Sequence, residues 1–477
     1  MRGCWPAEEI RAAERRLMDR LPDGALMARA AHAVAVHAGA LLGFHYGARV
    51  LLLVGSGDNG GDALFAGAEL ARRGAQVQAM LADPSRAHAG GLTALRASGG
   101  RVLPLPAAAD ADLIVDGLVG IGARGPLRAP LRPLVGHAAA SPAPVLAVDL
   151  PSGVDPDTGA VSGPAIHATV TACMGGYKPG LLVGEGRLHA GTVRLVPLGL
   201  DAELPDPDCL VLDDDDVAGA LRRPGPSDDK YTRGVVGVAA GSAAYPGAAR
   251  LCVGSARLGG VGAVRFAGQA AAEVVRRWPE VLVTDTPAEA GRVQAWTVGP
   301  GLGDGPEAVD ALRRVLAADV PVVVDADGLN LLANQAGLRG LLNGRSAPTV
   351  LTPHDREFER LFGAAGLADD RIGAARRAAA EVGAVVLLKG YVTVVAGPDG
   401  RCYLNPTGVP ALATAGSGDV LAGLAGSLLA TGIEPALAAA TAAYLHGRAA
   451  GLAAADGPVV AGDLLAALRA ELARHGI

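Results

Sequence analysis

Short apolar segments that end in Gly, Asp or Pro and alternate with helical segments constrain the fold of this chain most strongly. In the first half these segments are RVLLLVG (49–55), AQVQAMLAD (75–83), RVLPL (101–105), DLIVDGLVG (112–120), PVLAVDLPSG (144–153) and TVTACMGGY (169–177). In the second half they are VVGVAAGS (235–242), QAWTVGPGLG (294–303), PVVVDADGLN (321–330), PTVLTPHDREF (348–358), AVVLLKG (384–390) and the hairpin YVTVVAGPDGRCYLN (391–405). Continuous apolar runs of this length are typical of buried parallel strands. The pattern predicts an α/β fold built on mostly parallel sheets.

The length of 477 residues exceeds what one hydrophobic core usually organises, and it predicts two domains. The strand–helix alternation lapses at 201–229, where the chain is rich in Asp and Pro. We therefore expect a first domain over 1–208, a linker over 209–228 and a second domain over 229–477. The two halves share a class, but we find no aligned repeat between them.

Composition excludes several classes of function. The net charge of −6 offers no basic patch for nucleic acid or for a membrane surface, and the apolar runs are shorter than a bilayer span. The N-terminal segment is charged and helical in period, without an apolar signal core, so we expect a cytoplasmic protein. The five Cys show no C-x-x-C spacing and are interpreted as free apolar residues. Small-molecule substrates and a homo-oligomer are expected.

Only three of the 42 basic residues are Lys, namely Lys178, Lys230 and Lys389. Lys offers a compact charge with a tunable pKa, whereas Arg offers a planar and permanently charged fork. In a chain with this bias each Lys is informative, and all three lie inside or beside the motifs described below. This placement favours a functional role for the three Lys residues. It makes it less favourable to regard them as chance remnants of a coding bias towards Arg.

The tetrapeptide Gly-Ser-Gly-Asp occurs at 55–58 and again at 416–419. The first copy, read as GSGDNG, matches the G-x-G-x-x-G dinucleotide fingerprint, and Asp83 ends the next strand, so an NAD-dependent dehydrogenase is one alternative. However, Asp58 and Asp62 place two carboxylates where a pyrophosphate would need bare backbone N–H groups. The turn therefore favours a polar cup for a cation and hydroxyl groups.

Polar residues also end the neighbouring strands. Asp116 ends LIVD, and Asp149 and Ser152 end VLAVDLPSG. Since ligands bind beyond the carboxyl ends of parallel strands, we expect Asn59, Asp116 and Ser152 to converge, and their oxygen atoms suit a hard monovalent cation. Lys178 follows the next strand and is expected to face Asp149 as an acid/base partner.

These residues carry a resemblance. LMARAA, VGSGDNGGD, DGLVGIGARG, VDLPSGVDPDTG and YKPGLL resemble the epimerase domain of the NAD(P)H-hydrate repair enzymes, over roughly the first 200 residues. The resemblance implies a Rossmann-like three-layer sandwich, K⁺ bound by Asn59, Asp116 and Ser152, and a catalytic, substrate-contacting Asp149. It also implies that the hydrated nucleotide is held by Asp58, Asn59, Gly60, Gly61 and Asp62, and by Gly120, Ile121, Gly122, Ala123, Arg124, Gly125 and Pro126. The chain departs from the family at Asp58, where Asn is usual, and at Ala63, where Gly is usual.

The second Gly-Ser-Gly-Asp follows a loop and begins a long apolar helix, VLAGLAGSLLATG. Gly416, Ser417 and Gly418 therefore offer backbone N–H groups at a positive helix end, which suits a transferring phosphoryl group. Asp419, in the first helical turn, can accept a proton from a substrate hydroxyl. Further polar residues follow the strands of this half, and such a row is typical of one ligand cleft: Gly299 to Gly303, Asp325, Asp327, His354, Glu357 and Lys389.

This half is similar to the ribokinase-like superfamily. KYTRGVVGVAAGSAAYPGAARL, VGPGLG, TPHDREF, LLKGYVTVV and ATAGSGDVLAG resemble its ADP-dependent NAD(P)H-hydrate dehydratases from about residue 230 onward. The resemblance implies an α/β sandwich with a mostly parallel sheet, Mg²⁺ bound with ADP, and Asp419 as the catalytic base. The implied hydrate contacts are Ala248, Gly303, His354, Asp355, Arg356, Glu357, Phe358, Glu359, Arg360 and Asp419. The implied nucleotide contacts are Lys389, Gly390, Tyr391, Val392 and Thr393, and the stretch 409–418, with Ala415, Gly416, Ser417 and Gly418. The Lys-Gly that is usual near the domain start is interrupted after Lys230 by Tyr231 to Arg233.

The implied substrate is a nicotinamide ring hydrated at C6, whose hydroxyl is a poor leaving group. Phosphorylation from ADP, with Asp419 as base, would make it a good one, and loss of phosphate would regenerate NAD(P)H. The first half would interconvert the two hydrate epimers by reversible ring opening. Two alternatives stay open: a small-molecule kinase with a regulatory first half, and a first half that binds nucleotide or protein without catalysis.

Overall fold

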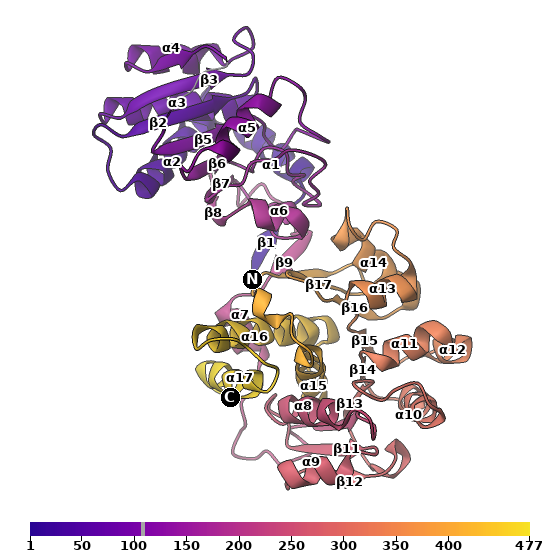
Figure 1. Cartoon of the computed structure of the whole chain (residues 1–477). Coiled ribbons are helices and arrows are strands. Elements are labelled where there is room, and N and C mark those ends of the chain that lie inside the picture. The colour runs from indigo at the N-terminus through magenta and orange to yellow at the C-terminus, as the bar shows by residue number, and fades with distance from the viewer. Residues whose placement is uncertain (106–109) are drawn as a thin grey trace. The chain divides into compact units, whose positions relative to one another are not determined.

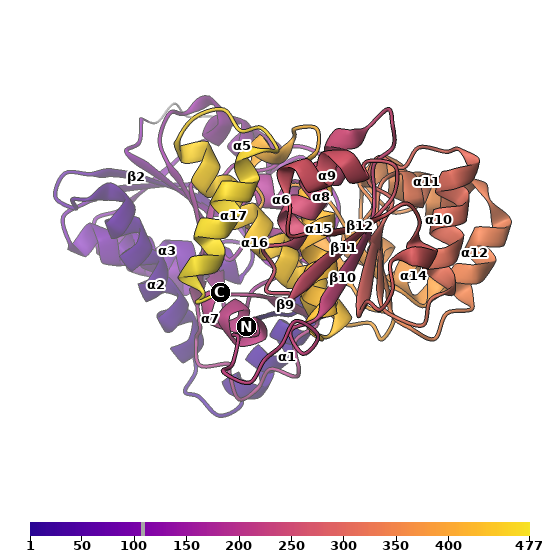
Figure 2. The same cartoon turned by 90° about the horizontal axis from the view of Figure 1, so that it is seen from below.

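The structure is a computed structural model that describes residues 1–105 and 110–477. It divides into two compact units, Gly3–Cys209 and Leu210–Ile477, the latter together with Met1–Arg2. Figures 1 and 2 show the elements of both units along the chain.

The N-terminal unit is built on a seven-stranded sheet in the order β4-β3-β2-β5-β6-β7-β8, and every pairing in it is parallel. Its strands are β2 (Arg49–Val54), β3 (Gln76–Leu81), β4 (Arg101–Leu103), β5 (Leu113–Gly117), β6 (Val145–Val148), β7 (Val170–Met174) and β8 (Thr192–Val196). Its helices are α1 (Ala7–Met18), α2 (Ala25–Leu42), α3 (Asp58–Arg72), α4 (Ala89–Ala97), α5 (Arg132–Ala140) and α6 (Gly184–His189), with a 3₁₀ turn η1 (Pro179–Leu181).

Side chains that alternate along β2 form the cores on both faces of this sheet. Val50 and Leu52 pack with α1, α2 and α3 on one face, whereas Leu51 and Leu53 pack with α5 on the other. This arrangement confirms the predicted three-layer sandwich. Helix α2 is long and apolar enough to cross a membrane by length and composition, and its buried face is part of this core.

The C-terminal unit carries an eleven-stranded sheet in the order β1-β9-β18-β17-β16-β15-β14-β13-β10-β11-β12. Its strands are β1 (Arg2–Cys4), β9 (Cys209–Val211), β10 (Val235–Ala239), β11 (Ala263–Ala267), β12 (Leu282–Thr284), β13 (Ala295–Val298), β14 (Val322–Val324), β15 (Thr349–Leu351), β16 (Val385–Leu388), β17 (Thr393–Ala396) and β18 (Cys402–Asn405). β16, β17 and β18 are joined by antiparallel pairings, and the predicted hairpin lies at β17–β18.

Helices cover both faces of this sheet, as Figure 2 shows. One face carries α8 (Pro246–Ala256), α9 (Ala271–Arg277), α15 (Ser417–Ala430), α16 (Pro435–Ala455) and α17 (Asp463–Arg474). The other carries α10 (Pro306–Ala317), α11 (Asp327–Asn334), α12 (Ala336–Asn343), α13 (Asp355–Phe362) and the end of α14 (Arg371–Val382), and the short turns η2 (Pro287–Glu289) and η3 (Pro410–Leu412) complete the unit. The predicted α/β sandwich with a mostly parallel sheet is confirmed.

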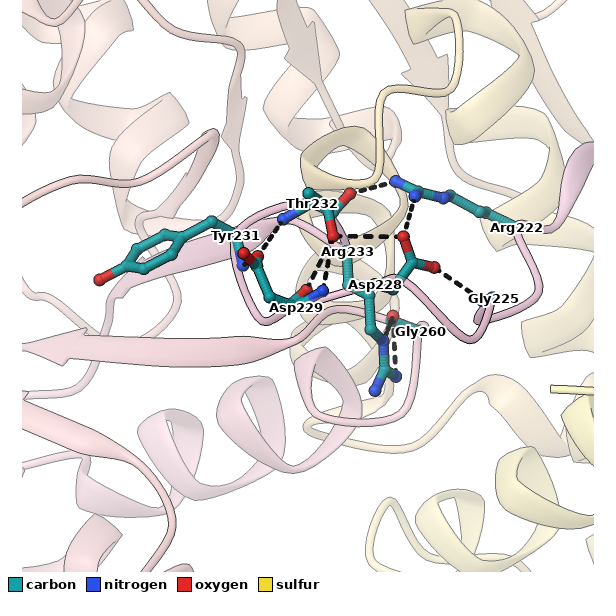
Figure 3. A network of polar contacts seen from close by, with 8 residues as sticks. All are labelled: Arg222, Gly225, Asp228, Asp229, Tyr231, Thr232, Arg233 and Gly260. Carbon is teal, nitrogen blue, oxygen red and sulfur yellow. Dashed lines mark hydrogen bonds and ion pairs between the residues drawn. The ribbon is translucent and has the colours of Figure 1, made fainter.

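The predicted linker at 209–228 is folded, and the structure differs from the prediction here. It contains β9 and helix α7 (Asp214–Ala220), whose capping box joins Asp213 and Asp216. After α7, Arg222 donates to Asp228 at 2.6 Å, and Asp229 accepts from the backbone N–H of Tyr231 at 2.7 Å (Figure 3). The Asp residues of this segment therefore cap a helix and close turns, which are uses that a composition resembling a linker conceals.

A glycine at the contact between α15 and α8 supplies a test of this packing. A Cβ on Gly423 would lie 2.0 Å from the carbonyl oxygen of Cys252 and 2.3 Å from Oγ of Ser255. We expect Gly423→Ala to lower the free energy of unfolding by about 1–3 kcal/mol, because the two helices must separate. The control Gly451→Ala, at an exposed position of α16 with no atom within 4 Å of the added Cβ, should be neutral or stabilising. Thermal unfolding measures both, and equal destabilisation of the two variants would contradict the close contact.

Candidate active sites

Helix α3 begins at the first Gly-Ser-Gly-Asp, directly after strand β2. A Cβ on Gly55 would lie 1.7 Å from the carbonyl oxygen of Leu118, and one on Gly60 would lie 2.3 Å from that of Gly55. These positions need Gly because backbone meets backbone there. The close approach brings Asn59 to the end of β6, where its Nδ2 donates to the carbonyl oxygen of Val148 at 2.7 Å.

Asp116 and Ser152 lie together beneath this loop and are both fully buried. Ser152 donates to the carboxylate of Asp116 from its backbone N–H at 2.8 Å and from its hydroxyl at 2.7 Å. Burial raises the pKa of Asp116 to about 6, although the hydrogen bonds from Ser152 oppose the shift. In the described part of the chain no Lys, Arg or His forms an ion pair with Asp116, so this carboxylate lacks a positive partner.

Asp149 and Lys178 form an ion pair in which the Lys178 side chain is fully buried. Lys178 Nζ also donates to the carbonyl oxygen of Met174 at 2.5 Å, and the backbone N–H of Met174 donates to Asp149 at 3.1 Å. Burial acts to lower the pKa of Lys178, but the charge and hydrogen bond of Asp149, together with the charges of Cys173 and Glu14, outweigh it, and the pKa is raised. The backbone of Asp149 has φ 70, a left-handed conformation that non-Gly residues seldom adopt outside functional or strained positions.

A cavity of about 760 Å³ lies at this end of the sheet. Its wall includes Arg11, Glu14, Asp58, Asn59, Asp62, Gly120, Ile121, Gly122, Ala123 and Asp149. Burial raises the pKa of Glu14 to about 7, and it raises the pKa of Asp62 as well, with the charge of Asp149 adding to both shifts. The cavity is therefore lined by carboxyl groups of which some retain a proton near neutral pH.

Helix α15 begins at the second Gly-Ser-Gly-Asp. Its N-cap, Gly416, has φ 88, a left-handed conformation that favours Gly, and Asp419 lies in the first turn. Burial raises the pKa of Asp419 to about 7, with the charge of Asp325 adding to the shift and that of Lys389 opposing it. A carboxylate with this pKa is suited to accept a proton at neutral pH.

Lys389 joins the strand ends of this second site. Its Nζ lies 2.7 Å from Oδ1 of Asp325, which also accepts from the hydroxyl of Thr352 at 2.7 Å. Lys389 Nζ is 3.6 Å from the carboxylate of Glu357, and a Cβ added to Gly418 would lie 3.5 Å from Lys389 Nζ. The ammonium group is thus beside the first turn of α15. Burial acts to lower the pKa of Lys389, but the charge and hydrogen bond of Asp325, together with the charges of Glu357 and Asp419, outweigh this effect, and the pKa is raised.

Helix α13 starts in a capping box between His354 and Glu357. His354 Nδ1 accepts from the backbone N–H groups of Arg356 and Glu357 at 3.1 and 3.3 Å, and Glu357 accepts from the backbone N–H of His354 at 2.8 Å. This reciprocal pairing fixes the turn after β15, and it holds Glu357 close to Lys389.

A second cavity, of about 830 Å³, lies over the start of α15. Its wall includes Tyr245, Ala248, Gly303, Asp304, Asp327, Asn330, Asn334, Ala415, Gly416 and Asp419. Gly303 is held there because its backbone N–H donates to Asp327 at 2.8 Å. The cavity thus brings a proton acceptor and a helix N-terminus to one wall.

Comparison with known proteins identifies both halves. The profile of the NAD(P)H-hydrate dehydratase family matches residues 236–472, and that of the YjeF-related protein N-terminus matches residues 23–180. The bifunctional NAD(P)H-hydrate repair enzyme of Mycobacterium tuberculosis is 52% identical over 444 residues, which is 92% of either chain. The chain belongs to the bifunctional NAD(P)H-hydrate repair enzymes.

Solved structures resemble the C-terminal unit of this family member. The ADP/ATP-dependent NAD(P)H-hydrate dehydratase of Bacillus subtilis, co-crystallised with ATP/Mg²⁺, is 32% identical with a TM-score of 0.50, and covers 55% of this chain and 97% of its own. A ribokinase-like superfamily protein of Enterococcus faecalis is 24% identical with a TM-score of 0.51, and covers 57% of this chain and 98% of its own. The likeness to the Enterococcus faecalis protein supports the fold alone.

The structure brings together most residues predicted for the first site. Asp58, Asn59, Asp62, the 120–123 turn and Asp149 line one cavity. Asp116, Ser152 and Lys178 are fully buried behind it. Gly60 and Gly61 pack within α3, and Arg124, Gly125 and Pro126 lie outside the wall, where Arg124 pairs with Asp157 at 2.7 Å.

The residues predicted for the second site fall into two groups. Ala248, Gly303, Ala415, Gly416 and Asp419 line its cavity. The segment His354, Asp355, Arg356, Glu357, Phe358, Glu359 and Arg360 forms the N-cap and most of α13, and Lys389 to Thr393 leads from β16 into β17. Ser417 and Gly418 lie in the first turn of α15, and Gly418 is next to Lys389.

Sequence reasoning missed Glu14, Tyr245, Asn330 and Asn334 as cavity residues. A signal existed for Glu14, because it occupies an inward position of α1, where the buried residues include Ile10 and Leu17. Tyr245 and Asn330 lie inside the quoted stretches KYTRGVVGVAAGSAAYPGAARL and PVVVDADGLN, and Asn334 lies beyond the latter, but nothing in these stretches marks the three as cavity residues, and only the fold brings them to the cavity.

The buried Asp149–Lys178 pair makes a prediction about stability. Lys178→Met keeps the volume of the stem but removes the charge, which leaves Asp149 buried without compensation. We expect a loss of about 3–5 kcal/mol in the unfolding free energy of the N-terminal unit. The control Lys230→Met removes an exposed Lys and should change little. The difference in unfolding free energy is measured by urea denaturation, with hydrogen exchange of peptides from β6 and β7 as the signal. Equal stability of the two variants would contradict the buried ion pair.

Proposed function

We propose that this chain repairs hydrated nicotinamide nucleotides at two active sites. The second half would dehydrate S-NAD(P)HX to NAD(P)H and convert ADP to AMP and phosphate, and the first half would interconvert R- and S-NAD(P)HX. The observation that carries the proposal is Asp419, a carboxyl group with a pKa raised to about 7 on the wall of a cavity, in the first turn of a helix. The likeness to the ADP/ATP-dependent dehydratase of B. subtilis supports use of either ADP or ATP.

The proposed dehydration begins with proton transfer to Asp419 from the C6 hydroxyl of the hydrate. The hydroxyl oxygen then takes the β-phosphoryl group of ADP, and AMP leaves. The C6–O bond breaks with release of phosphate, and a proton leaves C5 as the ring double bond re-forms. Only the epimer that presents its hydroxyl to Asp419 can follow this route.

The chain's own groups would stabilise the transferring phosphoryl group. The backbone N–H groups of Gly416, Ser417 and Gly418 lie at the positive end of α15, and Lys389 brings a charge beside Gly418. The Mg²⁺ that accompanies the nucleotide would supply further positive charge to its phosphates.

The first site would hold K⁺ through Asn59, Asp116 and Ser152. The fit rests on Asp116, a fully buried carboxylate without a positive partner in the described part of the chain, which is bonded to the hydroxyl of Ser152, and on Asn59, whose amide reaches the end of β6. Such a cation would supply the missing charge. Asp149 reaches the cavity and would exchange a proton with the hydrate, while Lys178 holds it from behind.

Two further properties are proposed, namely a cytoplasmic location and assembly into a homo-oligomer. The location agrees with a substrate pool of nicotinamide nucleotides. The five Cys are buried and form no disulfide within the described part of the chain, which accords with a reducing compartment.

Asp419→Asn tests the proposed base. We expect dehydration of S-NADHX to fall roughly 10²–10⁴-fold, because Asn cannot accept the proton, while R/S epimerisation continues. The measurement is NADH absorbance with and without ADP, together with chromatography of the epimers, and Asp456→Asn, an exposed Asp after α16, is the control. Full activity of Asp419→Asn would contradict the assignment, and a stable phosphorylated product in the wild type would instead support a kinase.

The pKa of Asp419 predicts how dehydration depends on pH. Since the raised pKa is about 7 and the base must be ionised, the rate should increase as pH rises from 6 to 8 and level off above the pKa. Below the pKa the slope should approach tenfold per pH unit. Initial rates at saturating S-NADHX and Mg-ADP measure this profile. A rate that is constant over the same interval would contradict the role of Asp419.

A further inference from the structure

Glu14 occupies a position of helix α1 where a core residue is expected. Ile10 and Leu17 are buried on the same face, four residues before Glu14 and three after it. Glu14 instead lines the cavity of the N-terminal unit. Glu8 and Glu9, on the same helix, are exposed. A carboxyl group on the inward face of a helix is costly unless a ligand or a proton compensates it.

The carboxyl of Glu14 makes no hydrogen bond and no ion pair within the part of the chain that the structure describes, so it is available to a ligand. The charged groups that face it are Arg11 on its own helix, Asp58 and Asp62 on α3, Asp149 after β6 and Lys178 after β7. Burial is the main cause that raises the pKa of Glu14 to about 7, and the charges of Asp149 and Asp58 add to it, while those of Lys178 and Arg11 oppose it. A carboxyl group with this pKa is protonated in a substantial fraction near pH 7 and can donate that proton.

Glu14 and Asp149 reach the cavity from different elements, and their surroundings differ. Asp149 forms an ion pair with Lys178, which is fully buried and lies outside the cavity wall. Lys178 therefore positions Asp149 and does not meet the ligand. Two titratable groups whose surroundings favour opposite protonation states are the arrangement expected of an acid and a base that act on one substrate.

We propose that Glu14 is the general acid of the epimerase site and acts with Asp149 as the general base, an inference that rests on the proposed function. Asp149 takes the proton of the C6 hydroxyl, the N1–C6 bond breaks, and its electron pair stays on N1, which takes the proton of Glu14. The ring-opened form carries an aldehyde at C6 and an N–H at N1. Rotation about the C5–C6 bond presents the other face. N1 then attacks C6, its proton returns to Glu14, and the proton on Asp149 returns to the oxygen, so that the enzyme ends unchanged.

The test uses Glu14→Gln in the full chain, with Glu8→Gln as the matched control on the same helix and Glu14→Asp as the conservative variant. Purified R-NADHX is followed by chromatography without nucleotide, after subtraction of the spontaneous rate. Dehydration of S-NADHX with ADP is measured in the same preparations, which reports the integrity of the second half independently. The far-ultraviolet circular dichroism of each variant is compared with that of the wild type.

We expect Glu14→Gln to epimerise roughly 10²–10⁴-fold more slowly than the wild type, with dehydration of S-NADHX unchanged. Because the acid must be protonated, the wild-type rate should fall as pH rises above about 7, the value to which the pKa of Glu14 is raised. This alkaline fall should be absent in Glu14→Gln and present in Glu14→Asp. A structural role for Glu14 would lower the rate without changing the shape of the profile.

Two results separate failure of this inference from failure of the proposed function. If the wild type does not epimerise above the spontaneous rate, the function proposed for the first half is wrong. If the wild type epimerises and Glu14→Gln retains both the rate and the alkaline fall, Glu14 is not the acid and Asp62 becomes the residue to test. The assignment would also be overturned if Glu8→Gln slowed epimerisation as much as Glu14→Gln does, because Glu8 does not reach the cavity.

Discussion

Each half of this protein depends on one buried ion pair between a Lys and an Asp that follow different strands of a parallel sheet. Asp149 and Lys178 follow β6 and β7, which are neighbours in the first sheet, and Asp325 and Lys389 follow β14 and β16, which flank β15 in the second. A carboxylate at such a strand end loses water on folding, and the pair is favourable only because a cation of the right size lies against it. The compact ammonium of Lys fits a single carboxylate oxygen where the planar fork of Arg needs two partners. This accounts for the use of two of the three Lys in a chain otherwise rich in Arg.

Each pair also sets the electrostatic surroundings of another carboxyl group, which reaches a cavity. The pKa of Glu14 and that of Asp419 are both raised to about 7, mainly by burial, and in each case a Lys opposes the shift while the Asp of the pair reinforces it. The two sites differ in what the pair touches. Asp149 is part of the cavity wall, whereas Asp325 and Lys389 lie beside the first turn of α15 and not on the wall. In the first site, Glu14 and Asp149 can both contact one ligand. In the second site, the positive charge of Lys389 lies beside a group that binds at the N-terminus of α15.

Much of this was predictable because it depends on strand ends, and strand ends are visible in sequence. The buried runs of β2, β5, β6 and β7 end in Gly or Asp, which predicted the approach of Asp149 to Lys178. Strand β8 was not predicted because it lies at the edge of the sheet and most of its residues are exposed. Helix α7 was not predicted because its Asp residues resemble those of a linker. Tyr245 and Asn330 lie in stretches that the sequence singles out, but their place on the cavity wall could not be predicted, because it depends on how α8 and α11 are positioned by the fold.

The two copies of Gly-Ser-Gly-Asp need their glycines for different physical reasons. Gly55 is required because its Cα meets the carbonyl of Leu118, whereas Gly416 is required because its backbone is left-handed, with φ 88. The aspartates differ accordingly. Asp58 begins α3 in the open and lines a cavity that holds further carboxyl groups and no Lys on the wall that the structure describes, while Asp419 lies in a first turn beside the charge of Lys389. A helix N-terminus attracts phosphate only when the surrounding charges permit it. The same four letters therefore favour a cation and the uncharged hydrated nicotinamide ring in one half, and a phosphoryl group in the other.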